Sequence, residues 1–179
     1  MLKYIKMILD RAIESLVMIV VAILALDVLW QVFTRFVLNH PSSWTEELAI
    51  FLLIWVALLG AAVALGRGSH LGIDYFINKL PLKDKLAVEI FVYLCIAVFS
   101  ILVMVTGGIE LVRTTLALKQ KSPALGIELG YVYLAVPVSG CFMVFYSILE
   151  LATYLILFLK GPEGLEEYRM KQIVSQKVD

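Results

Sequence analysis

The sequence predicts an all-α integral membrane protein with four tilted transmembrane helices. Of its 179 residues, 61% are hydrophobic and 17% are charged, and the mean hydropathy is +0.93. Soluble domains are closer to half apolar and a quarter charged, so this composition indicates a bilayer environment. The apolar segments lack the alternation of barrel strands, which leaves helices as the spanning structure. The net charge of zero gives no sign of nucleic-acid binding.

The four predicted spans occupy residues 13–38, 46–66, 87–110 and 129–159 of a single membrane domain, residues 1–179. A span needs about 20 apolar residues, and each segment reaches this length or comes close to it. The first and fourth spans are longer, so we expect them to tilt strongly or to project. The N-terminal apolar run is too long for a signal peptide and has no small-residue cleavage site, which favours a retained helix. Residues 160–179 form a polar tail that is expected to fray.

Lysine and arginine divide unequally between the two sides of the membrane. Of the 15 Lys and Arg residues, 11 precede the first span, follow the fourth span or lie between the second and third. The positive-inside rule therefore predicts that both termini are cytoplasmic. Residues 72–80 carry apolar side chains at i, i+3, i+4 and i+7, which predicts a short amphipathic helix at the membrane surface.

A polar stripe runs along the first span, where Asp27, Gln31, Thr34 and Arg35 fall at i, i+4, i+7 and i+8. Ionisable groups inside a membrane are costly and rarely face lipid. The stripe could line a path for an ion or a substrate. The other interpretation is a polar seam against another protein, with Arg35 near the outer headgroups.

The second span begins with two adjacent carboxylates, Glu46 and Glu47. Thr45 can serve as the N-cap, and carboxylates in a first turn favour the positive end of the helix dipole. Adjacent side chains point about 100° apart on a helix, so one of the two carboxylates can reach a basic partner across the outer surface. Trp44 lies where an interfacial Trp is expected.

Small residues follow one face of the second span at Ala57, Gly60, Ala61 and Ala64. Such residues let helix backbones approach closely, and packing within the chain is the expected explanation. Trp55 is expected to be a packing residue near mid-span. In the fourth span Glu150 needs a partner or a protonated state, and Pro137 is expected to kink the helix.

Catalytic and metal chemistry find little support. The sequence has two histidines, His40 and His70, and both lie at segment ends. Intramembrane metalloproteases, axial haem ligation and a serine nucleophile with a buried base all need histidines or equivalent ligands at membrane depth. We therefore expect no enzyme activity and no cofactor. Cys95 and Cys141 lie in apolar runs and are interpreted as small hydrophobes. A self-contained proton-coupled exporter would have to use Glu14, which lies at the cytoplasmic edge.

Two blocks of the sequence together form a recognisable pattern. The first block comprises Arg35-Phe36, Trp44, Glu46-Glu47-Leu48-Ala49, Trp55, Leu59-Gly60-Ala61-Ala62, Arg67, His70 and Asp74. The second block is residues 122–140, at the start of the fourth span. In this order the two blocks resemble the small membrane subunit of the tripartite ATP-independent periplasmic (TRAP) transporters, and the second block resembles that family's entry into its last span.

This resemblance implies a non-catalytic subunit in the bacterial inner membrane. Its partners would be a large multi-span membrane subunit, which carries the substrate and couples to sodium, and a periplasmic binding protein. The substrate would be an organic acid, of the sialic-acid or C4-dicarboxylate type. Glu46 and Glu47 would form an acidic edge toward these partners, and Arg67, His70 and Asp74 would fix the loop on the inner surface. The alternative is a scaffold or anchor subunit of another membrane complex.

Overall fold

The computed structural model describes residues 2–40, 42–67 and 81–162, together with residues 164–166, 168 and 170. In this part of the chain regular structure is helical, apart from an isolated bridge that pairs Lys121 with Glu128. Four helical stretches are long and apolar enough to cross a membrane, which confirms the fold class. The expected surface helix 72–80, with His70 and Asp74, lies outside the described residues.

The first two spans are unbroken helices, α1 (Leu2–Phe36) and α2 (Ser43–Gly66). α1 begins well before its apolar run because residues 2–12 contain no Gly or Pro to interrupt a helix. The expectation that Thr45 caps α2 is wrong, because Ser42 holds the extended N-cap position. Thr45 lies one turn later, fully buried, and its hydroxyl donates a hydrogen bond to the Ser42 carbonyl oxygen at 2.8 Å.

The third span is one long helical rod in three parts, α4 (Leu82–Phe99), the π-helical segment η1 (Ser100–Gly107) and α5 (Gly108–Ala117). Pro81 occupies the N-cap position of α4. The rod packs closely on the fourth span at two glycines. A Cβ added to Gly108 would lie 2.9 Å from Cδ of Pro137, and one added to Gly140 would lie 2.7 Å from Cβ of Met104.

The fourth span is interrupted between α6 (Leu129–Tyr133) and α7 (Ala135–Leu159). Pro137 explains the interruption, because it has no N–H to donate to the carbonyl of Tyr133, four residues earlier. The predicted effect of Pro137 on this helix is therefore confirmed as a break at Leu134.

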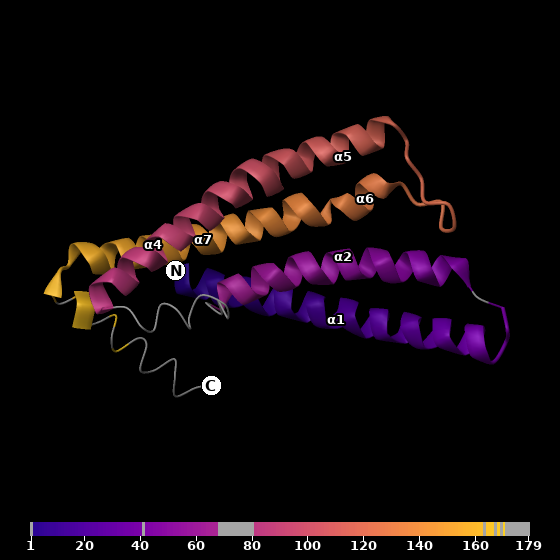
Figure 1. Cartoon of the computed structure of the whole chain (residues 1–179), viewed down its shortest axis with the longest axis horizontal. Coiled ribbons are helices and arrows are strands. Elements are labelled where there is room, and N and C mark those ends of the chain that lie inside the picture. The colour runs from indigo at the N-terminus through magenta and orange to yellow at the C-terminus, as the bar shows by residue number, and fades with distance from the viewer. Residues whose placement is uncertain are drawn as a thin grey trace.

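The helices lie side by side, and each packs mainly on its neighbours in the order α1, α2, α7 and α4–η1–α5. Figure 1 shows α1 and α2 as one pair and the third and fourth spans as a second pair, with the two pairs displaced along the long axis of the molecule. We call these the first and second helix pairs. We call the end of the molecule where α2 begins the Trp44 end, and the end where α2 stops the Arg67 end.

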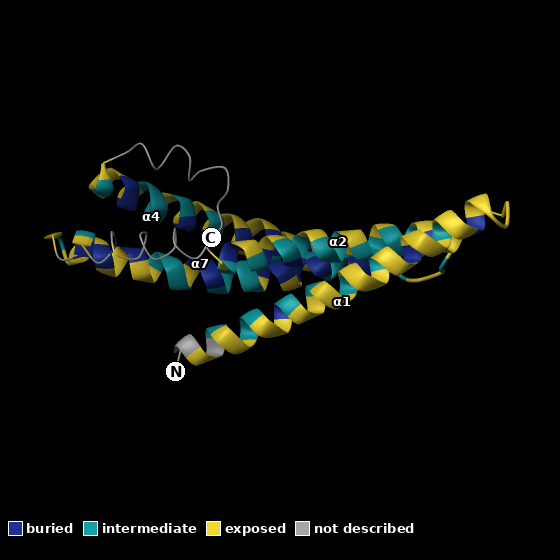
Figure 2. Ribbon diagram, turned by 90° about the horizontal axis from the view of Figure 1, so that it is seen from below, coloured by how far each residue is buried: buried dark blue, intermediate teal, exposed yellow. Residues whose placement is uncertain are grey.

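The apolar core lies toward the Arg67 end, where both pairs meet. The buried residues of this core are Ile13, Leu65, Leu86, Tyr93, Tyr146, Tyr154, Leu157 and Tyr168. Figure 2 shows that α1, in contrast, is exposed along most of its length. The expectation of a frayed tail is wrong at Tyr168, which is 1% exposed and packs edge-on against Tyr154 with ring centroids 5.9 Å apart.

Candidate functional site

Six polar side chains join both helix pairs at the Arg67 end, and we call them the Arg67 cluster. α1 supplies Lys6, Asp10 and Glu14, which are four residues apart and therefore lie on one helix face. The remaining members are Arg67, Tyr146 and Glu150. Each α1 side chain reaches a partner on α7 or at the end of α2.

Three contacts define the cluster. Lys6 Nζ donates to Glu150 Oε1 at 2.8 Å. The Tyr146 hydroxyl donates to Asp10 Oδ1 at 2.6 Å. Arg67 donates to Glu14 Oε1 from Nε at 2.9 Å, with the terminal nitrogen at 2.7 Å. Two of these contacts hold α1 to α7, a helix with which it shares little backbone packing.

The cluster answers two questions raised by the sequence. Glu150, which needed a partner inside the fourth span, has one in Lys6. Glu14 is bound to Arg67 at the end of α2, so its carboxylate has a structural contact. Sequence reasoning missed Lys6, Asp10 and Tyr146, although the regular spacing of Lys6, Asp10 and Glu14 was a signal that could have found the α1 members.

The predicted polar stripe of α1 is divided by the structure. Asp27 and Thr34 are buried, Gln31 is half-buried and Arg35 is exposed. Because α1 packs mainly on α2, the buried members form a seam within the chain, and the expected seam against another protein is wrong for them. Within the described residues, Asp27 Oδ2 is buried without a hydrogen-bond partner.

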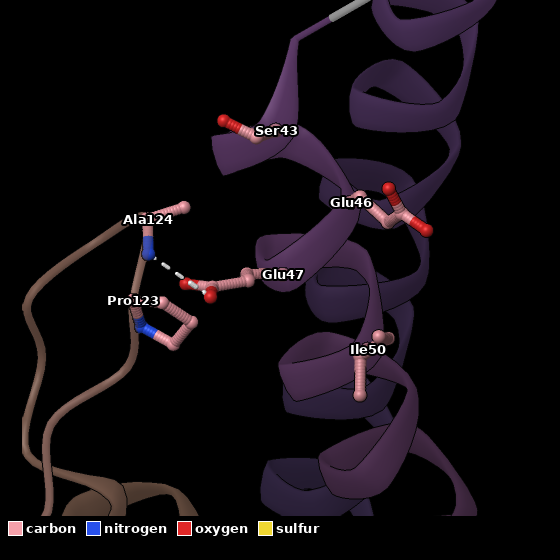
Figure 3. A pocket seen from close by; sticks show the side chains of 6 residues that line it. All are labelled: Ser43, Glu46, Glu47, Ile50, Pro123 and Ala124. Carbon is pink, nitrogen blue, oxygen red and sulfur yellow. Dashed lines mark hydrogen bonds between the residues drawn. The ribbon is translucent and has the colours of Figure 1, made fainter.

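At the Trp44 end, Glu47 holds the loop that connects the third and fourth spans. Its carboxylate accepts hydrogen bonds from the backbone N–H groups of Ala124 and Leu125, both at 3.0 Å. Figure 3 shows Glu47 directed to this loop and Glu46 directed away from it. The loop is thus tied to the first turn of α2. Trp44, in the same turn of α2, is exposed.

An open groove of about 390 Å³ lies between the loop and α2 (Figure 3). It is lined by Ser43, Glu46, Glu47, Ile50, Pro123 and Ala124. Since Glu47 is already engaged by the loop, Glu46 is the carboxylate left facing outward. The sequence predicted that adjacent carboxylates point in different directions, and the structure shows Glu47 turned to the loop and Glu46 turned away from it (Figure 3).

One face of α2 is open along its whole length. The small residues predicted to pack within the chain do not do so, because Ala57, Ala61 and Ala64 are exposed. A Cβ added to Gly60 would meet nothing within 4 Å. Trp55 is half-buried, as a packing residue would be. We define the open face of α2 as Glu46, Ile50, Leu53, Ala57, Gly60, Ala61 and Ala64.

The chemistry available to these residues is binding and positioning. Among the described residues, no three or more His, Cys, Asp or Glu side chains gather where they could hold a metal ion. Arg67 pairs with Glu14, so the predicted inner-surface cluster is represented in the described residues by Arg67 alone.

Comparison with known proteins agrees with this arrangement of spans. Residues 24–156 match the family model for the DctQ component of tripartite ATP-independent periplasmic transporters. The sialic acid TRAP transporter small permease protein SiaQ of Vibrio cholerae is 32% identical over 158 residues, which cover 88% of this chain and 90% of that protein.

Two further relatives extend the comparison. The C4-dicarboxylate TRAP transporter small permease protein DctQ of Rhodobacter capsulatus is 32% identical over 57% of this chain and 44% of its own length. The sialic acid TRAP transporter permease protein SiaT of Haemophilus influenzae is 33% identical over 64% of this chain, which covers 18% of that larger protein. The four apolar helices and these matches identify a multi-pass protein of the bacterial inner membrane, and the chain belongs to the DctQ family of TRAP transporter small permease subunits.

Proposed function

We propose that this chain is the non-catalytic small subunit of a sodium-driven importer of an organic acid, and that it packs against the large membrane subunit through the open face of α2. The open face carries the proposal. Its small residues would let a partner helix approach closely in a membrane, where packing and not hydrophobic burial drives association. A Cβ added at Gly60 would meet nothing within 4 Å, so packing within the chain does not explain why this residue is a glycine.

Glu46 would complete the same contact at the Trp44 end. It lies exposed on the open face, and it forms no ion pair with any residue in the described part of the chain. A basic side chain of the large subunit or of a periplasmic binding protein would complement it. This role requires the Trp44 end to face the periplasm, as the distribution of Lys and Arg predicts.

The proposed substrate is sialic acid. SiaQ of Vibrio cholerae matches 88% of this chain, whereas DctQ of Rhodobacter capsulatus, from a C4-dicarboxylate transporter, matches 57%. The SiaT permease of Haemophilus influenzae matches 64% of this chain, and this match covers 18% of that larger protein. In this proposal the substrate and sodium are handled by the large subunit.

Co-purification of the large subunit with tagged variants tests the packing proposal. Gly60→Leu should reduce recovery of the large subunit about tenfold, because a bulky side chain would separate the two helices. Ala22→Leu is the matched control, since Ala22 is an exposed small residue on α1. Equal recovery with both variants, at equal membrane insertion, would show that the large subunit binds elsewhere. Uptake of labelled sialic acid and of a C4-dicarboxylate by the complete transporter tests the substrate.

A further inference from the structure

Asp27 is the one buried acidic residue among the described residues, and its Oδ2 atom forms no hydrogen bond. Its side chain is 7% exposed, in the seam between α1 and α2. The other buried polar side chain of the α1 stripe is satisfied, because the Thr34 hydroxyl donates to the carbonyl oxygen of Gln31 at 2.9 Å. The seam therefore satisfies Thr34 and leaves the carboxyl group of Asp27 without a donor.

Asp27 is far from any other charge on its own helix. Between Glu14 and Arg35 it is the only charged residue of α1. Arg35 follows about 12 Å along the axis and is exposed, so it lies outside the buried seam. Glu14 precedes by about 20 Å and is bound to the end of α2. The contacts of α1 with α7 involve Lys6 and Asp10, which lie further away still.

The register of the first helix pair shows which part of α2 lies opposite Asp27. The contact between Glu14 and Arg67 places these two residues at the same level of the antiparallel pair. Thirteen residues after Glu14 along α1 is Asp27, and thirteen residues before Arg67 along α2 is Ile54. Because the rise per residue is the same in both helices, Asp27 lies about level with Ile54.

This level of α2 offers no cation to the Asp27 carboxyl group. Residues 48–66 of α2 contain no charged side chain. The nearest charged residues of α2 are Glu47 and Glu46, about 10–12 Å along the axis from Ile54, and they are acidic. A negative charge on Asp27 would thus be surrounded by apolar residues and would meet charges of its own sign at the closest approach.

We propose that Asp27 binds a proton and is a neutral carboxylic acid at neutral pH, so that the seam between α1 and α2 contains a buried proton-binding site. A carboxylate that is removed from water without a partner gives up its charge, because the neutral form is far less costly to bury. The proton is taken from water as α1 enters the bilayer. The neutral acid gains an O–H group, which can donate to a backbone carbonyl of the preceding turn, as short polar side chains do in helices.

A metal cation is the other ligand that a buried carboxyl group could take. Hard cations are held by several oxygen ligands, and in the described part of the chain no three or more His, Cys, Asp or Glu side chains gather around Asp27 or elsewhere. A cation from a partner subunit is also excluded from the carboxyl group by its burial within this chain. The proton needs no further ligand and fits the space available.

The bound proton makes the first helix pair sensitive to pH in one direction. The folded chain holds this proton more tightly than the unfolded chain, in which the side chain meets water. Stability therefore falls as the pH rises and the proton is removed from the folded state. Asp27→Asn keeps the shape of the neutral acid and cannot ionise, so this loss of stability should be absent from the variant.

Infrared spectroscopy of the full-length protein in lipid vesicles tests the proposal. A neutral carboxylic acid has a C=O stretching band that a carboxylate lacks, and carbon-13 in the aspartate side chains shifts the bands of aspartates alone. The unaltered chain should show this shifted acid band at neutral pH. Asp27→Asn should remove the band. Asp84→Asn is the matched control, since Asp84 is exposed in the first turn of α4, and this variant should keep the band.

Absence of the acid band from the unaltered chain at neutral pH would overturn the proposal, and this result does not depend on whether a variant folds. A band that survives Asp27→Asn would assign the proton to another aspartate and would overturn it equally. Thermal unfolding at rising pH gives a second readout, in which equal declines of the unaltered chain and of Asp27→Asn would contradict a proton at Asp27. A midpoint raised by sodium chloride and not by choline chloride would show a metal cation in its place. These measurements use the subunit alone, so they are independent of the proposed partner and substrate.

Discussion

Lys6 and Glu150 form an ion pair at 2.8 Å although 144 residues separate them in the chain. The pair is part-buried, and Lys6 also lies over the ring of Tyr146, 6.0 Å from its centroid. Together with the hydrogen bond between Tyr146 and Asp10, it fixes the N-terminal half of α1, a segment that is otherwise largely exposed.

Replacing one member of this ion pair should destabilise the chain more than replacing both members. Lys6→Met leaves the Glu150 carboxylate without this partner and should cost about 1–3 kcal/mol of unfolding free energy. The double variant Lys6→Met with Glu150→Leu should recover part of the loss, because no partly buried charge is left over. Thermal unfolding of the four members of this double-mutant cycle in detergent checks the prediction. Additive losses would show that the two side chains are not coupled.

Glu47 should control the mobility of the loop that it binds. Glu47→Ala removes both acceptors of the Ala124 and Leu125 N–H groups, so exchange of these two amides with deuterium should accelerate about tenfold. Glu46→Ala is the matched control, since Glu46 points away from the loop. Hydrogen exchange followed by mass spectrometry of the loop peptide gives the readout. Similar exchange in both variants would mean that the loop is held by other contacts.

Two glycines should respond in opposite ways to an added methyl group. Gly140→Ala places a Cβ 2.7 Å from Cβ of Met104, so the third and fourth spans must separate. This overpacking should cost about 1–3 kcal/mol. Gly60→Ala should be neutral or slightly stabilising, since an added Cβ there meets nothing within 4 Å. Midpoints of thermal unfolding compare the two, and equal midpoints would contradict the close packing at Gly140.

Tyr168 should anchor the part of the chain that follows the last span. Tyr168→Ala removes a ring that packs on Tyr154 and is 1% exposed, at a cost of about 3 kcal/mol. Met170→Ala, at a position 59% exposed, should change stability little. Limited proteolysis after Lys160 provides the measurement. If cleavage is as slow in Tyr168→Ala as in the unaltered chain, the aromatic contact does not hold this segment.

The four spans could be predicted from the sequence because a bilayer imposes a simple requirement. About 20 apolar residues in a row suffice to identify a span, whatever the helix later packs against. The effect of Pro137 was also predictable, since the missing N–H is a local property of the residue. The family could be predicted from two blocks of residues, and the comparisons confirm it.

The partners of individual polar residues could not be predicted in the same way. Glu150 needed a partner, but its identity depends on how far α7 is displaced relative to α1, which hydropathy does not encode. The same holds for Glu47. The helix dipole already explains a carboxylate in the first turn of α2, so the sequence gives no sign of the contact with Ala124. The small residues of α2 were assigned to packing within the chain because spacing shows a face without showing what it meets.

The side-by-side order of the helices has a consequence for biosynthesis. Each pair joins spans that are neighbours in sequence, so α1 and α2 can pair while the rest of the chain is still on the ribosome. Asp10, however, meets Tyr146 only after 136 further residues have been made. The polar face of α1 must therefore wait, solvated at the membrane surface, until α7 enters the bilayer. The last span to be inserted is thus the one that completes the assembly of the first.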